Sequence, residues 1–426
     1  MRLNYLRTFF VGFAFLSICS FWNLYDSIIP LILENNFDKS DTYIGVILAL
    51  DNIFAIFMLP LFGTLSDRVH TRFGKRTPFI VLGTAVAVFA MIALPFAANS
   101  LRLVVFLVAL GTVLIAMSTY RSPAVALMPD LTPKPLRSKA NAIINLMGAI
   151  GSIYTLLAIK FLTPKSKPGE YTDYTYVFIA VGALMVFSVI VLLLKINENK
   201  MSIKNDECED DSEHIRGKGR MPREVRKSLI FLLLSVSFWF ISYNAVASTY
   251  SRYIENVMNI KDGGFATSLL IGTIAAVISY IPVAQLSSRF SRKKIIITGV
   301  VIMTISFAAA IPIDSYNAFM YIILVAVGFG WAAINVNSYP MVVEMSSGSD
   351  IGKYTGLYYT FSMAAQVITP ILSGLLIDNL NIGYRVLFPY AAFFSALALI
   401  TMLFVKHGDS KPIPKNSLLE SISGED

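Results

Sequence analysis

The chain has 426 residues, of which 55% are hydrophobic, and its mean hydropathy is +0.65. This apolar fraction excludes a soluble enzyme or binding domain and indicates a protein that crosses the membrane several times. The formal net charge is +8. The basic residues gather in short loops between apolar runs, which argues for a membrane topology signal and against a nucleic-acid partner.

Twelve apolar runs are long enough to cross a membrane, for which a helix needs about 20 residues. Long continuous runs favour helices over the short alternating strands of a barrel. The predicted fold is an all-α membrane protein with twelve transmembrane helices in two pseudo-symmetric six-helix halves. The runs cover residues 9–33, 43–62, 78–98, 103–127, 139–162, 174–194, 228–250, 265–287, 295–312, 316–343, 353–377 and 383–405.

One long polar interruption divides these spans six and six. It predicts an N-terminal half over residues 1–196, a linker over 197–227, a C-terminal half over 228–405 and a tail over 406–426. The linker is interpreted as a solvated connector, with a regulatory role as the alternative. Most Lys and Arg residues fall in the loops on one side. We therefore expect both termini in the cytoplasm and the protein in the plasma membrane.

A basic loop follows the second apolar run and is repeated in weaker form at the same place in the second half. Charges this dense cannot lie in hydrocarbon, and a signature that occurs once per half is typical of a duplicated transporter. The loop resembles the one between helices 2 and 3 of the major facilitator superfamily. The resemblance implies a cytoplasmic gate, which contacts neighbouring helices rather than substrate, formed by Gly63, Asp67, Arg68, Gly74, Lys75, Arg76 and Arg289.

Two further stretches narrow the resemblance. Residues 72–80 are similar to a loop of the sucrose-transporter-like and the glycoside, pentoside and hexuronide cation symporter branches. Residues 123–131 resemble the segment between helices 4 and 5 of sucrose-transporter-like proteins. Val125 stands where sucrose transporters of this type carry an arginine. The acids that bind the cation in melibiose carriers are replaced here, so no sodium site is carried over; those positions read Ala55, Leu59 and Arg121.

Ionisable residues inside the predicted spans are few, and each is unfavourable there unless it is paired or hydrated. Asp26 lies in the first span, Asp51 near the middle of the second and Arg121 in the cytoplasmic third of the fourth. An aspartate that gains and loses a proton can couple transport to a proton gradient. Asp26 and Asp51 are therefore candidates for proton or substrate binding, with a structural hydrogen bond as the alternative. Arg121 is a candidate either for the cavity wall or for snorkelling to the surface.

Neutral polar and aromatic side chains also gather inside the spans. Trp331, Asn335 and Ser338 share one face of the tenth predicted helix. Amides both donate and accept hydrogen bonds, and a ring can stack on the apolar face of a sugar, so this stripe suits a hydroxyl-rich ligand. Ordinary helix packing is the alternative. By the same reasoning, the substrate-cavity candidates are Trp22, Tyr25, Asn141, Asn145, Trp239, Tyr243, Asn244, Trp331, Asn335, Tyr358 and Gln366.

The sequence contains no convincing enzyme motif. The three histidines lack metal-ligand spacing, and no Walker sequence for an ATP-driven pump is found. We expect no catalytic residues, no metal and no cofactor, with a proton as the coupling ion. The expected partners are a small-molecule solute and membrane lipids, without nucleic acid, and nothing in the sequence demands more than a monomer.

The expected function is secondary active transport of a small polar solute, with a sugar or glycoside favoured, by proton-coupled symport with alternating access. The first alternative is proton-driven efflux of hydrophobic or toxic compounds, which would suit an apolar cavity. A ligand receptor built on a transporter scaffold is the second.

Overall fold

The computed structural model describes residues 4–69, 71–132, 137–166, 170–201, 222–315, 317–345, 351–380 and 382–408. Within these ranges, twelve helices are long and apolar enough to span a membrane, which confirms the predicted number. The first half contains α1 (Tyr5–Asn35), α2 (Asp41–Arg68), α3 (Thr77–Asn99), α4 (Leu103–Leu131), α5 (Arg137–Leu162) and α6 (Thr175–Lys195). The second contains α8 (Arg223–Asn256), α9 (Ala266–Arg289), α10 (Arg292–Ala310), α11 (Ala318–Glu344), α12 (Ile351–Asn379) and α13 (Leu387–Leu403).

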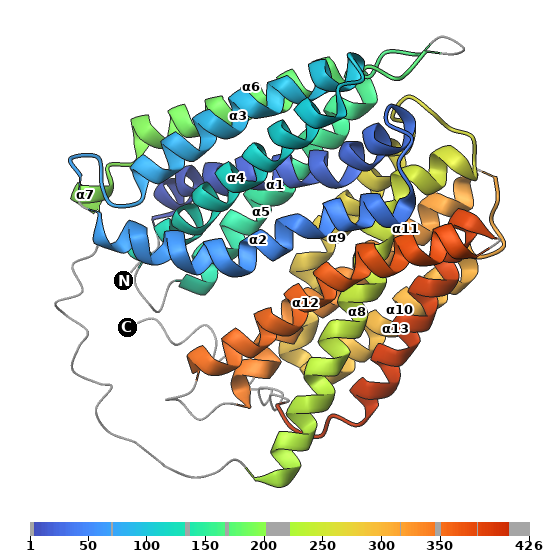
Figure 1. Cartoon of the computed structure of the whole chain (residues 1–426). Coiled ribbons are helices and arrows are strands. Elements are labelled where there is room, and N and C mark those ends of the chain that lie inside the picture. Colours follow the sequence, from blue (N-terminus) through green and yellow to red (C-terminus); the bar gives the residue numbers. More distant parts are fainter. Residues whose placement is uncertain are drawn as a thin grey trace.

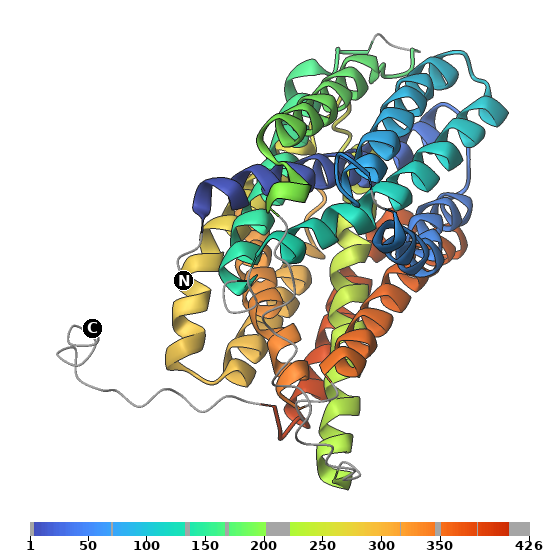
Figure 2. The same cartoon turned by 90° about the vertical axis from the view of Figure 1, so that its left-hand side faces the viewer.

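The two six-helix halves lie side by side and diverge along the length of the molecule (Figures 1 and 2). At one end, the end of α1 and the start of α2 meet the end of α8 and the end of α12. At the opposite end, where α1 begins and α13 ends, the helices of the two halves spread apart. We call these the closed end and the open end.

Two helices, α2 and α12, carry the tightest packing between the halves. A Cβ built on Gly45 would lie 2.1 Å from the carbonyl oxygen of Pro370, and one built on Gly374 would lie 2.3 Å from the carbonyl oxygen of Asp41. Only glycine leaves room for such an approach. The two halves therefore touch backbone to backbone along this crossing.

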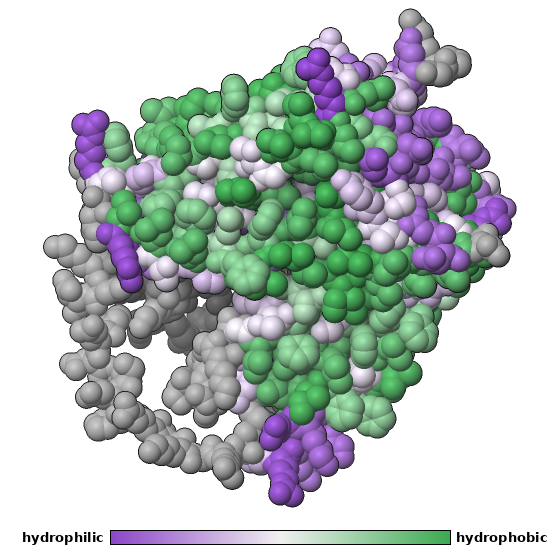
Figure 3. Space-filling model, viewed as in Figure 1, coloured by the Kyte–Doolittle hydropathy of each residue, from purple (hydrophilic) through white to green (hydrophobic). Residues whose placement is uncertain are grey.

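The outer surface is apolar around the middle of the molecule and polar at its ends. Figure 3 shows hydrophobic side chains over the middle and hydrophilic ones towards both ends. Large apolar residues such as Phe57, Phe89 and Leu194 are more than two-thirds exposed. This is the surface of helices whose outer faces meet lipid.

The first residues of the predicted linker fold onto the first half as a short helix, α7 (Glu198–Met201). The buried carboxylate of Glu198 accepts hydrogen bonds from the backbone N–H groups of residues 75–77, at 2.9–3.0 Å. A carboxylate is stabilised at a helix N-terminus, so Glu198 caps α3. The other end of the predicted linker also differs, because α8 already begins at Arg223. The segment 197–227 thus includes folded residues at both ends.

Candidate functional site

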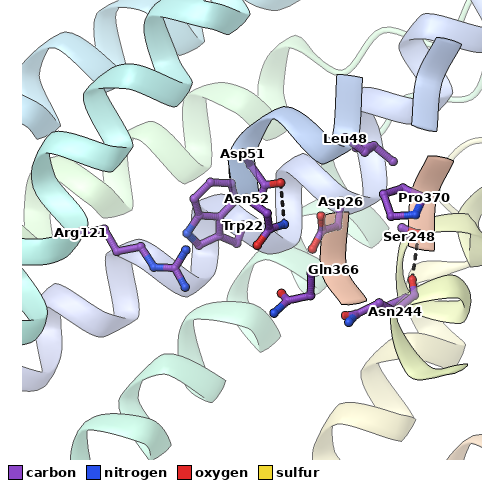
Figure 4. Close-up of a pocket in the computed structure, with 11 residues that line it drawn as sticks. Trp22, Asp26, Leu48, Asp51, Asn52, Arg121, Asn244, Ser248, Gln366 and Pro370 are labelled. Carbon is purple, nitrogen blue, oxygen red and sulfur yellow. Dashed lines mark hydrogen bonds between the residues drawn. The ribbon is translucent and has the colours of Figure 1, made fainter. Parts of the chain in front are cut away.

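A cavity of about 220 Å³ lies between the two halves. Its wall is built by α1, α2 and α4 of the first half and by α8 and α12 of the second, so both halves contribute side chains (Figure 4). Seven of its eleven lining residues are polar or charged. The lining residues are Trp22, Asp26, Leu48, Asp51, Asn52, Arg121, Asn244, Ala247, Ser248, Gln366 and Pro370.

Three ionisable side chains face this cavity. Asp51 accepts a hydrogen bond of 2.7 Å from Nδ2 of Asn52. The guanidinium of Arg121 lies 5.6 Å from the centre of the Trp22 ring, and an indole face attracts a cation at this distance. Figure 4 draws no hydrogen bond from Asp26 to the other lining residues. With both aspartates ionised, the three groups carry one net negative charge, which a bound proton can offset.

Two N–H donors in the wall are buried without a hydrogen-bond partner in the part of the chain that the structure describes. They are Nε1 of Trp22 and Nδ2 of Asn244. The hydroxyl of Ser248 donates to the carbonyl of Asn244 at 2.8 Å, and Nε2 of Gln366 donates to the carbonyl of Ser362 at 3.3 Å. A buried donor left unpaired costs about 1–3 kcal/mol. Neither nitrogen has accessible surface in this conformation, so a ligand with oxygen acceptors would reach these two donors only after their side chains turn towards the cavity.

The cavity brings together several residues that the sequence predicts from different spans. These are Trp22, Asp26, Asp51, Arg121, Asn244 and Gln366. Sequence reasoning missed Asn52 and Ser248, which also line the wall. Asn52 directly follows Asp51, and Ser248 lies one helical turn after Asn244, so their spacing from predicted residues was the available signal.

Other predicted cavity residues are used for packing. The buried hydroxyl of Tyr25 donates to the carbonyl of Ile47 at 2.9 Å, and Trp239 lies fully buried in the core. Tyr243 and Trp331 stack on each other, with 3.7 Å between their ring centres and 4° between their planes. These rings belong to the helix packing that the sequence left as the alternative interpretation.

The remaining predicted cavity residues are also absent from the lining. The hydroxyl of Tyr358 lies 3.0 Å from that of Ser338, in a buried hydrogen bond between α11 and α12. Asn335 is half-buried and Asn145 is exposed. The side chain of Asn141 lies outside the described residues.

The predicted gate residues form an ionic network at the open end, within the first half. Arg76 is buried and pairs with Asp67 of α2 at 2.5 Å and with Asp130 of α4 at 3.0 Å. Its Nη1 also donates to the carbonyl of Gly63 at 3.1 Å. Nζ of Lys75 lies 3.1 Å from Asp130. The network joins α2, α3 and α4, and its second acid, Asp130, was not among the predicted gate residues.

The remaining gate candidates are Gly74, Arg68 and Arg289. Gly74 has φ of 116°, and a Cβ there would lie 2.1 Å from Oε2 of Glu198, so no other residue fits. Arg68 is exposed at the last position of α2. Arg289 ends α9, and its side chain lies outside the described residues. Within the described part of the chain, no three His, Cys, Asp or Glu side chains are grouped to hold a metal ion.

The sequence of this chain is similar to those of known proteins. A family model described as the Major Facilitator Superfamily matches residues 11–289 and 263–422. The chain is 26% identical over 199 residues to the uncharacterized protein YqgE of Bacillus subtilis (strain 168), covering 44% of each chain. It is 29% identical over 120 residues to the Sucrose transport protein SUC3 of Arabidopsis thaliana, covering 24% of this chain and 20% of that protein. The matches thus span less than half the length of either relative.

Solved transporter structures share the fold. The inward open conformation of the xylose transporter XylE from E. coli matches with a TM-score of 0.68 and 12% identity, over 98% of both chains. A POT family transporter in complex with 5-aminolevulinic acid matches with a TM-score of 0.70 and 12% identity, over 94% of this chain and 95% of that one. A mutant of the nucleoside transporter NupG matches with a TM-score of 0.67 and 14% identity, over 94% and 100%. At these identities the likeness concerns the fold alone.

Proposed function

The chain belongs to the Major Facilitator Superfamily, and on this premise we propose that it is a proton-coupled symporter of a sugar or glycoside. The family and the shared fold make it a transporter of small solutes rather than an enzyme. The sugar, the proton and the direction of transport are the proposal. The basic loops near Gly63 further support an orientation with the open end in the cytoplasm.

One observation carries the proposal: a cavity lined by both halves brings two aspartates, an arginine and three side-chain amides together. After a rotation of the Trp22 and Asn244 side chains, a sugar hydroxyl or ring oxygen would accept from Nε1 of Trp22 and Nδ2 of Asn244. Its hydroxyls donate to the aspartates and to the carbonyl oxygen of Gln366. Because α1, α2 and α4 rock against α8 and α12, such a ligand would be exposed to each side in turn.

The aspartates of the cavity supply the proton coupling. Asp26 and Asp51 stand on neighbouring helices, and Arg121 keeps its positive charge at every physiological pH. A single proton on one aspartate makes the three groups neutral overall. A neutral cavity closes around a sugar at a smaller electrostatic cost than a charged one. Proton and sugar would therefore move together.

The test uses purified protein in liposomes that contain a pH-sensitive dye. A panel of monosaccharides, disaccharides and glycosides is added to wild type and to Asp26→Asn and Asp51→Asn. The matched control is Asp38→Asn, because Asp38 is exposed at the closed end and its φ of 50° is one that Asn tolerates. We expect sugar-dependent acidification in wild type and control, and its loss in at least one cavity variant.

Two results would contradict the proposal. One is that no member of the panel moves protons while an imposed proton gradient drives lipophilic cations across the membrane, which would establish efflux instead. The other is sugar uptake without any proton movement, which would leave a sugar transporter that is not a symporter.

A further inference from the structure

A polar cluster at the closed end joins the two halves at a place separate from the cavity. Arg252 of α8 is only 2% exposed and forms an ion pair with Asp41, the first residue of α2. Nδ2 of Asn256 donates to Oε1 of Glu34 at 2.8 Å, and the hydroxyl of Tyr384, in the 3₁₀ helix η3 (Gly383–Val386), reaches the same carboxyl group. Four elements, two from each half, thus meet around Glu34.

The Tyr384 hydroxyl lies close to two carboxyl groups but has only one hydrogen to donate. Its oxygen lies 3.0 Å from Oε1 of Glu34 and 2.8 Å from Oδ1 of Asp41. A tyrosine hydroxyl carries one hydrogen, whereas an ionised carboxylate can only accept. If both carboxyl groups were ionised, one of these two short contacts would bring together two oxygen atoms without a hydrogen between them. One additional proton completes the row of hydrogen bonds from Glu34 through Tyr384 to Asp41.

The partners of the two acids indicate which one holds this proton. Asp41 faces the guanidinium of Arg252, and a carboxylate in such a pair keeps its charge. Oε2 of Glu34, in contrast, is buried with no hydrogen-bond partner among the described residues. A neutral carboxyl group leaves an unpaired oxygen at far smaller cost than a carboxylate. Glu34 can then donate to Tyr384, and Tyr384 can donate to Asp41.

The surrounding charges agree with this assignment. Besides Asp41 and Arg252, Glu34 faces Glu255 of α8, whose carboxyl group accepts from Nδ2 of Asn35 at 3.0 Å. Asp378 of α12 accepts from the backbone N–H groups of Asp41 and Thr42, at 3.0 and 2.7 Å. The cluster therefore contains several acids and one buried cation. Removing one negative charge from it is favourable.

We propose that Glu34 is a second proton-binding site of this protein, and that closure of this end takes up one proton from water. The proton sits on Oε1 of Glu34, between the carboxyl group and the Tyr384 hydroxyl. When the halves separate at this end, Glu34 faces water, where a glutamate is ionised at neutral pH, and the proton is released. The site binds no solute and acts on the conformational equilibrium.

The direction of the pH effect follows from linkage. The closed form binds one more proton than the form that is open at this end, so a rise in pH favours opening. Once Glu34 is mostly ionised in the open form, each further pH unit changes the ratio of the two forms about tenfold, until the proton also leaves the closed form. Acid on this side of the membrane therefore holds this end shut.

The experiment measures the distance between spin labels at the closed end. Ser100, between α3 and α4, and Ser315, between α10 and α11, are exposed and belong to different halves. Both are changed to cysteine in a chain whose native Cys19 and Cys208 are replaced by serine. Distance distributions are recorded from acidic to alkaline pH without substrate. In wild type we expect the short distance at low pH and a growing long-distance population as pH rises.

Four variants make the assignment specific. Glu34→Gln keeps the shape and is neutral, so it should show the short distance at every pH. Tyr384→Phe removes the partner of the proton, so opening should begin at a lower pH than in wild type. Glu255→Gln removes a neighbouring negative charge, so the response should remain but begin at a lower pH. Asp38→Asn, the matched control at an exposed site of the same end, should keep the wild-type response.

The outcomes separate cleanly. The proposal is overturned if wild-type distances do not change with pH, if Glu34→Gln responds as wild type does, or if the response is lost in Glu255→Gln or Asp38→Asn instead. Since no sugar is present, failure here leaves the proposed sugar symport untouched. Failure of the sugar assay likewise leaves this site untouched.

Discussion

Gly45 of α2 lies directly against the carbonyl oxygen of Pro370 in α12, so closely that a Cβ on Gly45 would lie 2.1 Å from it. Pro370 also lines the cavity. The same crossing thus holds the two halves together and forms part of the wall that would face a ligand. Any enlargement at Gly45 acts on both.

Replacing Gly45 with alanine should separate α2 from α12 at the cavity wall. Overpacking of this kind destabilises proteins by about 1–3 kcal/mol. We expect a lower thermal unfolding temperature in detergent and a reduced transport rate. The control is Gly111→Ala in α4, where nothing lies within 4 Å of the added Cβ. Equal behaviour of the two variants would show that the backbone contact is unimportant.

Replacing Trp22 with phenylalanine should weaken sugar binding while the fold is kept. The variant retains an aromatic face beside Arg121 and loses only the Nε1 donor. The loss of one hydrogen bond, about 0.5–1.5 kcal/mol, corresponds to a rise in KM of about two- to tenfold. Trp239→Phe removes another buried Nε1 without a described partner, but outside the cavity, and should leave KM unchanged. A rise of KM in both variants would argue against a direct contact.

Replacing Glu198 with glutamine should loosen the connection between α7 and the loop before α3. Loss of a helix cap costs about 0.5–2 kcal/mol, and the charge that favours the start of α3 is lost as well. We expect a lower unfolding temperature, measured in detergent. Glu170→Gln, at an exposed site, is the comparison and should match wild type. An unchanged temperature for Glu198→Gln would mean that the amide replaces the carboxylate fully.

Replacing Arg252 with methionine should open the closed end, because it leaves the partly buried Asp41 without its cation. Breaking one partner of a buried pair costs about 3–5 kcal/mol. The closed form should be depopulated in the spin-label distances. The double variant Arg252→Met, Asp41→Asn removes both charges and should recover part of the short-distance population. No difference between the single and double variants would show that the pair does not act as a unit.

Much of the architecture could be predicted from the sequence, because a span of about 20 apolar residues has few alternatives. All twelve predicted runs correspond to long helices, which extend a few residues beyond them at most ends. Polar and charged residues next to the apolar runs continue these helices into the polar ends of the molecule. The helical turn at Glu198 could not be predicted from local sequence, because it is held by residues 75–77 and has no apolar pattern of its own.

The site was predicted only in part, for physical reasons that differ between residues. Asp26, Asp51 and Arg121 stand out because a charge inside a span needs an explanation. Tyr243 and Trp331 carry the same sequence signal whether they stack on a ligand or on each other. The cluster around Glu34 was missed altogether. Charges at the ends of spans are common, and the sequence does not reveal that Arg252 meets Asp41 across the two halves.

In the part of the chain that the structure describes, the hydrogen bonds between the two halves gather at the closed end, and the cavity lies beyond them. An inhibitor should therefore act differently from the two sides of the membrane. A compound that fills the cavity but is too bulky to be enclosed would reach it from the open end and hold the halves apart there. Such a blocker would act mainly from the compartment at the open end, and its weaker effect from the other compartment would measure how often the closed end opens.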